Sequence, residues 1–139
     1  MNAFRYNDIQ VGSEYRFTKV FTQGDVEAFS QLSGDLNPLH LDVEYSRGTK
    51  FKKPIVQGML AAALFSRIIG VYCPGKYGLY MSQDVKFHKP IYVDTEVEVV
   101  GRVVKKMDAL QIVTLQTLIK DKTSEEILVS GRAITKMLH

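Results

Sequence analysis

The chain has 139 residues, of which 45% are hydrophobic and 24% are charged, and its formal net charge is +3. This length suits one core, so we expect a single domain over residues 1–139, and scattered Lys and Arg residues argue against nucleic-acid binding. The lone Cys73 permits no internal disulfide, and the sparse His and Cys residues offer no metal-ligand pattern. The polar first residues do not resemble a signal peptide and no apolar run suits a membrane span, so we expect a cytoplasmic protein.

The N-terminal third predicts a strand, a helix and a loop. Residues 18–22 end an extended segment, and a helix is expected from about residue 24 to 32, with Thr22 and Asp25 as its capping pair and Gly34 as its stop. Residues 35–40 read Asp-Leu-Asn-Pro-Leu-His. Pro38 disfavours a helical conformation at the residue before it, so this stretch predicts a rigid loop. Asp42 then caps a short helical turn that extends to about residue 46.

The remainder predicts one long helix followed by strands. Residues 57–72 have almost no polar face, which predicts a helix buried on all sides. After a turn at residues 73–76, apolar residues alternate with polar ones in four segments, 79–87, 95–105, 110–120 and 127–137, which predicts an antiparallel meander. The predicted class is α+β, a curved antiparallel sheet wrapped around one long buried helix. An exposed sheet edge would favour pairing with a second copy.

Asp35 and His40 are the Asp and His pair that a rigid loop would hold close together. A carboxylate can take a proton from water, and an imidazole that titrates near neutral pH can share that water or pass a proton on. The pair therefore suits the addition or elimination of water. The alternative is that Asp35 and Asn37 make turn hydrogen bonds and that His40 is a half-buried side chain without a catalytic role.

Two residues of the long helix are further candidates. Gly58 opens this helix, where its N–H would point outward with the positive end of the helix dipole and could hold an enolate oxygen. The alternative is that glycine permits close packing. Ser66 could contact a thioester or acyl group in a buried tunnel, or its hydroxyl could bond back to the carbonyl of Ala62.

Residues 29–40, Phe-Ser-Gln-Leu-Ser-Gly-Asp-Leu-Asn-Pro-Leu-His, together with Ser46, resemble the hydratase motif of the MaoC-like (R)-specific enoyl-CoA hydratases. The resemblance continues through residues 53–60 and 87–90. It implies a hotdog fold, usually a homodimer, that hydrates trans-2-enoyl-CoA to (R)-3-hydroxyacyl-CoA. Coenzyme A would be part of the acyl-CoA substrate, and no separate cofactor or metal is implied.

Carried over to matching positions, the resemblance assigns Asp35 and His40 to the activation of water and the protonation of the α-carbon. Asn37 would hold the loop, and the Gly58 N–H would bind the thioester carbonyl as it becomes an enolate. The family commonly has His-Gly where this chain has Gln57-Gly58. The backbone donor survives that change, whereas an imidazole that could orient the loop or the substrate is lost.

Three other functions remain open from the sequence. The same chemistry in reverse would dehydrate 3-hydroxyacyl groups on acyl carrier protein, and hotdog proteins also include acyl-CoA thioesterases. The intact stretch from Asp35 to His40 argues against a thioesterase. A non-catalytic acyl-binding protein is favoured only by the change at Gln57.

Overall fold

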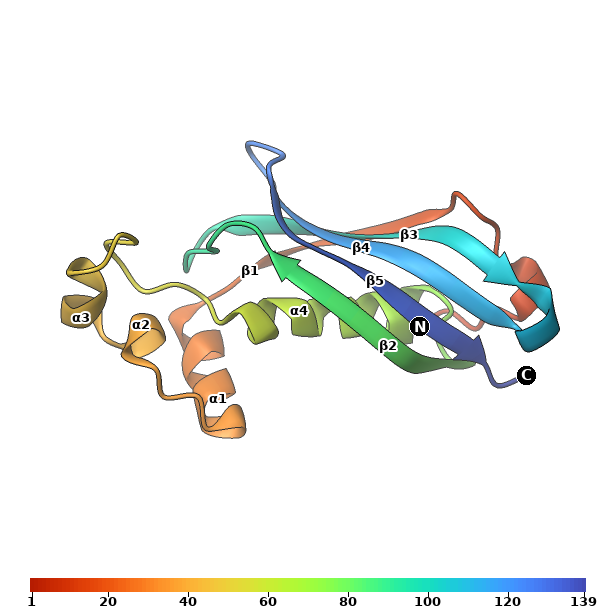
Figure 1. Ribbon diagram of the computed structural model, residues 1–139, viewed down its shortest axis with the longest axis horizontal. Helices are drawn as coiled ribbons and strands as arrows, with labels where there is room; N and C mark the ends of the chain where they lie inside the picture. Colours follow the sequence, from red (N-terminus) through yellow and green to blue (C-terminus); the bar gives the residue numbers. More distant parts are fainter.

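A five-stranded antiparallel sheet forms most of the molecule in a computed structural model that describes residues 1–139 (Figure 1). Its strands are β1 (Glu14–Val20), β2 (Gly78–Phe87), β3 (Glu96–Met107), β4 (Ile112–Asp121) and β5 (Ile127–Met137). The alternating pattern places Val97 and Val99 in the core and leaves Glu96 exposed, as a half-buried strand requires. The four predicted C-terminal strands are thus confirmed, although β4 starts at residue 112 because residues 108–110 form a 3₁₀ turn.

The strand order is β1-β3-β4-β5-β2, which corrects the prediction of a simple meander. β2 pairs with β5, from Gly78 opposite Met137 to Phe87 opposite Val129, and not with β3, the next strand along the chain. The other side of β3 is occupied by β1. Residue patterns reveal that a segment is extended, but the choice of partner depends on contacts between segments distant in the sequence.

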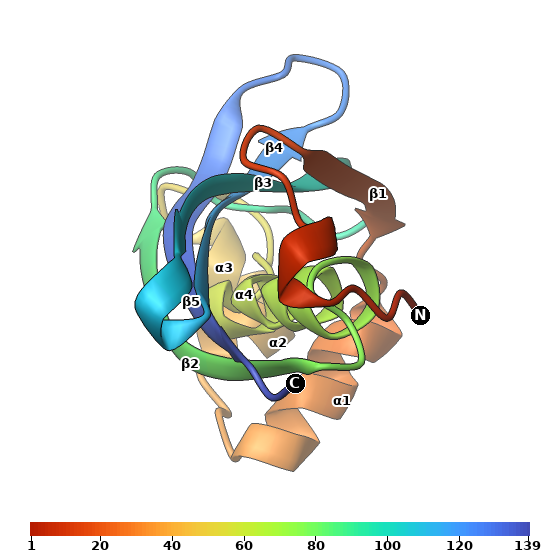
Figure 2. The same ribbon diagram turned by 90° about the vertical axis from the view of Figure 1, so that its right-hand side faces the viewer.

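The sheet curves around the central helix α4 (Gly58–Arg67), which continues as the π-helical turn η2 (Ile68–Tyr72). Figure 2 looks along this helix and shows the sheet above it, on one side of it and below it. Helix and sheet approach closely at Gly101, where an added Cβ would overlap the Cγ2 of Ile68. The predicted α+β fold, a curved antiparallel sheet around one central helix, is confirmed.

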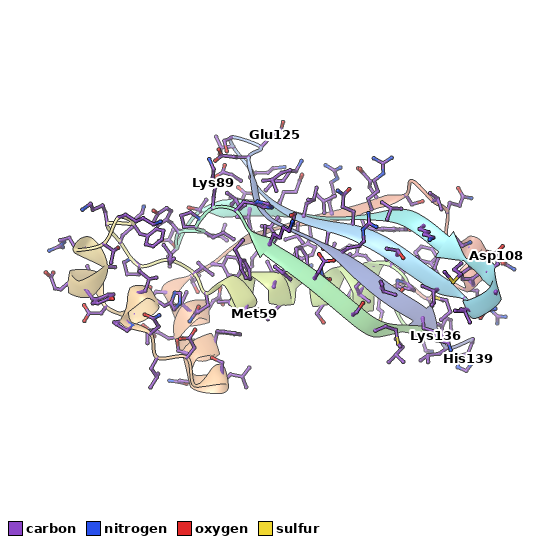
Figure 3. The ribbon with its side chains drawn as sticks, viewed as in Figure 1. Met59, Lys89, Asp108, Glu125, Lys136 and His139 are labelled. Atoms are coloured by element: carbon purple, nitrogen blue, oxygen red, sulfur yellow. The ribbon has the colours of Figure 1, made fainter.

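One face of α4 and η2 is exposed, which corrects the prediction that this helix is buried on all sides. Met59 is 61% exposed, and Ser66 and Val71 are exposed on the same helix. Figure 3 shows Met59 on the side of α4 that faces away from the sheet. The curved sheet encloses only part of the helix circumference, so apolar residues on the remaining face have no cover within one chain.

Helix α1 (Gln23–Ser33) has the predicted capping box, with the Asp25 N–H 3.1 Å from Thr22 Oγ1 and the Thr22 N–H 3.0 Å from Asp25 Oδ2. The same backbone hydrogen bond from Thr22 is the largest factor that lowers the pKa of Asp25. Gly34 ends the helix with a left-handed φ of 78°. The loop between α1 and the next helix, which contains Asp35, therefore starts from a fixed helix end.

The stretch predicted as a loop contains the short helix α2 (Pro38–Leu41), and α3 (Val43–Arg47) follows it. Pro38 occupies the first helical position, where a missing N–H costs nothing, so it starts a helix here rather than preventing one. The side chains of Asn37 and Asp42 accept hydrogen bonds from the backbone N–H groups of Leu39 and Tyr45. Figure 1 shows α1, α2 and α3 at the end of the molecule where α4 begins. None of the helices is long and apolar enough to cross a membrane.

Candidate active site

A pocket of about 480 Å³ lies where the loop after α1, the start of α4 and the end of β2 meet. That volume is within the range of small-molecule sites. Half of its lining residues are hydrophobic. The residues that line it are Asp35, His40, Lys50, Phe51, Ile55, Val56, Gln57, Gly58, Met59, Ala61, Phe87, His88, Lys89, Pro90, Ile91 and Val129. Three of the residues singled out from the sequence, Asp35, His40 and Gly58, therefore share one pocket.

Asp35 and His40 lie next to each other in the pocket wall, with their polar atoms directed at each other. The distance from Asp35 Oδ2 to His40 Nε2 is 3.8 Å, and the Asp35 side chain is 42% exposed whereas His40 is buried. Asp35 Oδ1 accepts a hydrogen bond from the backbone N–H of Asn37, which leaves Oδ2 directed at the imidazole. The carboxylate is thus both anchored to its loop and open to the pocket.

The hydrogen bond on the far side of the imidazole fixes its tautomer. His40 Nδ1 is 2.7 Å from the backbone oxygen of Ile55. A carbonyl oxygen only accepts, so Nδ1 carries the hydrogen and, in the neutral ring, Nε2 keeps its lone pair. Nε2 and Asp35 Oδ2 are then two acceptors, 3.8 Å apart, with no hydrogen between them. One water can donate to both through bonds of ~2.8 Å, so the pair forms a site for a single water.

Asn37 is beside this pair but does not line the pocket. Its side-chain oxygen accepts from the Leu39 N–H at 3.0 Å, and its backbone oxygen accepts from the His40 N–H at 3.1 Å. Both bonds fix the first turn of α2, which carries the imidazole. The Asn37 side chain therefore contacts the backbone of α2, whereas its backbone N–H holds the Asp35 carboxylate.

Gly58 is the first residue of α4, and its N–H has no hydrogen-bond partner within the chain, as is usual for the first turn of a helix. A Cβ at this position would be 2.8 Å from Cε1 of Phe87. Glycine therefore admits the Phe87 ring at the pocket wall, whereas the position at the helix start leaves the N–H of this pocket residue without a partner.

Ser66 lies on the exposed face of α4 and is not among the residues that line the pocket. The sheet does not cover this face of the helix within one chain, so the contact of Ser66 with an acyl group stays a prediction. Cys73 is fully buried, and desolvation raises the pKa of its thiol to about 11. The thiol is protonated at neutral pH and is not a nucleophile.

Gln57 was noted in the sequence only as a departure, whereas the structure shows it to be a buried polar side chain at the site. Its Nε2 donates to the backbone oxygen of Val26 at 3.0 Å and to Ser30 Oγ at 2.9 Å. A polar residue directly before an apolar helix was the available signal. The sequence offered no way to identify its partners, which are about thirty residues away in helix α1.

Several known proteins resemble this chain in sequence and in fold. The family model described as the MaoC like domain matches residues 7–124. An (R)-specific enoyl-CoA hydratase from Aeromonas caviae is 39% identical over 129 residues, which cover 93% of this chain and 96% of that protein. A mitochondrial 3-hydroxyacyl-[acyl-carrier-protein] dehydratase from Arabidopsis thaliana is 39% identical over 89 residues, or 64% of this chain and 52% of that protein.

A solved structure of the (R)-hydratase from A. caviae has a TM-score of 0.89 with this chain at 39% identity, over 93% of this chain and 97% of that one. The shared architecture is the hotdog fold. The relatives named above are hydratases and dehydratases, which are hydro-lyases. With a family model that spans most of its length and relatives that share its fold, the chain belongs to the MaoC-like domain family.

Proposed function

We propose that this chain is a hydro-lyase that adds water reversibly to trans-2-enoyl-CoA and forms (R)-3-hydroxyacyl-CoA. The observation that carries the proposal is the pair of acceptors, Asp35 Oδ2 and His40 Nε2, in the same pocket as the free N–H of Gly58. The substrate class and the (R) configuration are supported by the names of relatives such as the A. caviae hydratase.

In the proposed reaction, a water donates one hydrogen to Asp35 and one to His40. As its oxygen bonds to C3 of the enoyl group, one of these protons transfers to the pair, and the π electrons move onto the thioester oxygen as an enolate. The Gly58 N–H donates to that oxygen. The enolate then takes the proton from the pair at C2, so the net change is the addition of one water and the pair returns to its starting state.

The carrier is less closely defined than the reaction. Lys50 and Lys89 line the pocket, where cationic side chains suit the phosphates of coenzyme A, although Lys89 is also paired with Glu126. Dehydration of a 3-hydroxyacyl group on acyl carrier protein is the second candidate, favoured by the similarity to the Arabidopsis dehydratase. Rates with the same acyl group on the two carriers distinguish these candidates.

The direct test of the reaction is to mix purified protein with crotonyl-CoA and follow the loss of absorbance of the conjugated enoyl thioester. We expect loss to an equilibrium level, which the same enzyme reaches from 3-hydroxybutyryl-CoA. If folded protein changes neither compound, and neither longer enoyl-CoA chains nor the same acyl groups on acyl carrier protein react, the proposed function is wrong.

The location in the cytoplasm stays a prediction.

Replacing Gly58 with alanine tests the proposed oxyanion donor. The new Cβ would meet the Phe87 ring at 2.8 Å, so the ring and the first turn of α4 must shift and displace the N–H. Removal of such a donor typically costs about 10²-fold or more in rate, so we expect a loss of kcat/KM approaching that value. Gly70→Ala is the matched control, because nothing lies within 4 Å of its Cβ position. Full activity in Gly58→Ala would contradict this role of the N–H.

We further propose that two copies associate through the β2 edge and the uncovered face of α4. β2 is an edge strand of ten residues, and Met81 on β2 and Met59 on α4 are both exposed. Unpaired strand edges and clustered apolar side chains favour association. We expect sedimentation equilibrium to give twice the chain mass of 15.7 kDa.

A single charge on this edge should weaken the association. Met81→Asp is expected to raise the dissociation constant at least about tenfold, or about 1.4 kcal/mol, because a carboxylate would be desolvated in the interface. Leu110→Asp is the control, since Leu110 is equally exposed but lies on the 3₁₀ turn between β3 and β4. A monomer at micromolar concentration, or equal effects of the two changes, would contradict the proposed interface.

A further inference from the structure

The side chain of Gln57 is almost completely enclosed, with only 2% of the residue exposed, although it belongs to the pocket wall. Its Nε2 donates two hydrogen bonds, to the Val26 oxygen and to Ser30 Oγ. The Val26 oxygen has no hydrogen to give, so the nitrogen of the amide must face it, and the orientation of the amide is fixed. Oε1 is buried without a partner.

The two acceptors of Gln57 are also the two buried residues of α1. Val26 and Ser30 are the residues of this helix that are enclosed by the rest of the chain. Helix α1 thus docks through a narrow strip, and Gln57 makes a hydrogen bond to each of its two members. Loss of the amide would remove the polar part of this contact and leave only apolar packing at Val26.

The strip connects directly to Asp35. The backbone oxygen of Ser30 accepts the N–H of Gly34, which ends α1, and Asp35 follows at once. In the other direction, Gln57 immediately precedes Gly58, the proposed oxyanion donor, and lies two residues after Ile55, which accepts the hydrogen bond from His40 Nδ1. One short segment therefore contacts all three parts of the site.

We propose that Gln57 is a positioning residue that holds the end of α1, and with it Asp35, at its working distance from His40 and Gly58. It does so through its two hydrogen bonds to Val26 and Ser30 and need not contact the substrate. The kinetic test of this inference rests on the proposed hydratase function. The two hydrogen bonds that hold α1 are a property of the fold and can be tested without it.

Gln57→Met is the test variant, because methionine has a similar length and no hydrogen-bond donor. A displacement of about 1 Å at a reacting group can cost about 10²-fold in rate, so we expect kcat on crotonyl-CoA to fall roughly 30- to 100-fold. The KM should change less than about threefold, because the acyl-binding walls of the pocket remain. A loss of folded protein would also lower the apparent kcat at an unchanged KM, so kcat is calculated per folded enzyme, with the folded fraction measured separately.

Thr135→Val is the matched control for stability. The Thr135 hydroxyl is also buried and donates to a backbone oxygen, that of Val113 at 3.0 Å, but it lies in the β4–β5 pair and does not line the pocket. We expect a similar drop in melting temperature in the two variants, and wild-type kcat only in Thr135→Val. Equal values of kcat in the two variants would overturn the proposal.

Two further variants test whether Gln57 acts through its hydrogen bond to Ser30. Ser30→Ala removes one acceptor and should lower kcat less than Gln57→Met, and it should have almost no added effect in the Gln57→Met background, because both changes break one contact. Gln57→His places an N–H donor at the same position and should recover part of the lost kcat. Fully additive effects, or no recovery, would mean that Gln57 acts by some other means.

The failure of the proposed function can be told apart from the failure of this inference. If the wild-type protein converts no enoyl thioester, the proposed function is wrong. The attachment of α1 through Gln57 is then measured by amide hydrogen exchange in α1. Exchange in α1 should be faster in Gln57→Met than in both the wild type and Thr135→Val. Unchanged exchange in α1 would overturn the proposal that Gln57 holds this helix, whatever the activity.

Discussion

Asp35→Asn is expected to abolish hydration of crotonyl-CoA, with a loss of about 10³-fold or more in kcat, while the protein stays folded. The asparagine oxygen can still accept the Asn37 N–H, so the loop keeps its hydrogen bond. The new NH₂ group would replace Oδ2 and donate toward His40 Nε2, 3.8 Å away in the native pair. One acceptor for the water is lost and the other is blocked, which removes general acid–base catalysis.

The measurement is the steady-state rate of the variant beside its thermal unfolding curve. Because the Asp35 side chain is 42% exposed and makes no buried ion pair, we expect an unfolding temperature close to that of the wild type. A variant that is folded and retains activity within tenfold of the wild type would show that the carboxylate is not part of the chemistry.

His40→Ala is expected to lose a comparable factor in kcat and also some stability. The change removes Nε2 from the pocket and leaves the Ile55 oxygen without the donor that it has in the native chain. An unsatisfied, partly buried carbonyl costs about 1–3 kcal/mol, so the free energy of unfolding should fall by about that amount. The rate and the stability therefore report on two different nitrogens of one ring.

His40→Asn separates these two effects. Its side-chain amide can take the position of Nδ1 and donate to the Ile55 oxygen, but it has no atom at the position of Nε2. We expect this variant to recover much of the lost stability, as measured by denaturant unfolding, and to stay as inactive as His40→Ala. Substantial activity in His40→Asn would contradict the assignment of Nε2 as an acceptor of the reacting water.

Local patterns in the sequence predicted most of the elements. The Thr22–Asp25 capping box and the alternation of Val97 and Val99 with charged residues are determined by neighbours within a few positions, so they can be recognised without the fold. The loop motif that contains Asp35 and His40 is equally compact. These residues share a pocket because Pro38 starts a short helix that turns His40 back toward Asp35.

Features that depend on distant segments were not predictable in this way. The pairing of β2 with β5 and the hydrogen bonds from Gln57 to α1 join residues far apart in the chain. The exposure of the α4 face that carries Ser66 likewise depends on where the distant strands lie. A helix without a polar face was expected to be buried, but a sheet of five strands encloses it only in part. Residue type alone does not reveal which surface is left over.

The most direct test of the central claim is to run the reaction of crotonyl-CoA in D₂O and to identify the product by mass spectrometry and chiral analysis. If Asp35 and His40 activate water and return a proton to C2, the product is (R)-3-hydroxybutyryl-CoA with one deuterium at C2, and it forms only with the wild-type pair. Release of free coenzyme A, the (S) alcohol, or equal conversion by Asp35→Asn would contradict the claim.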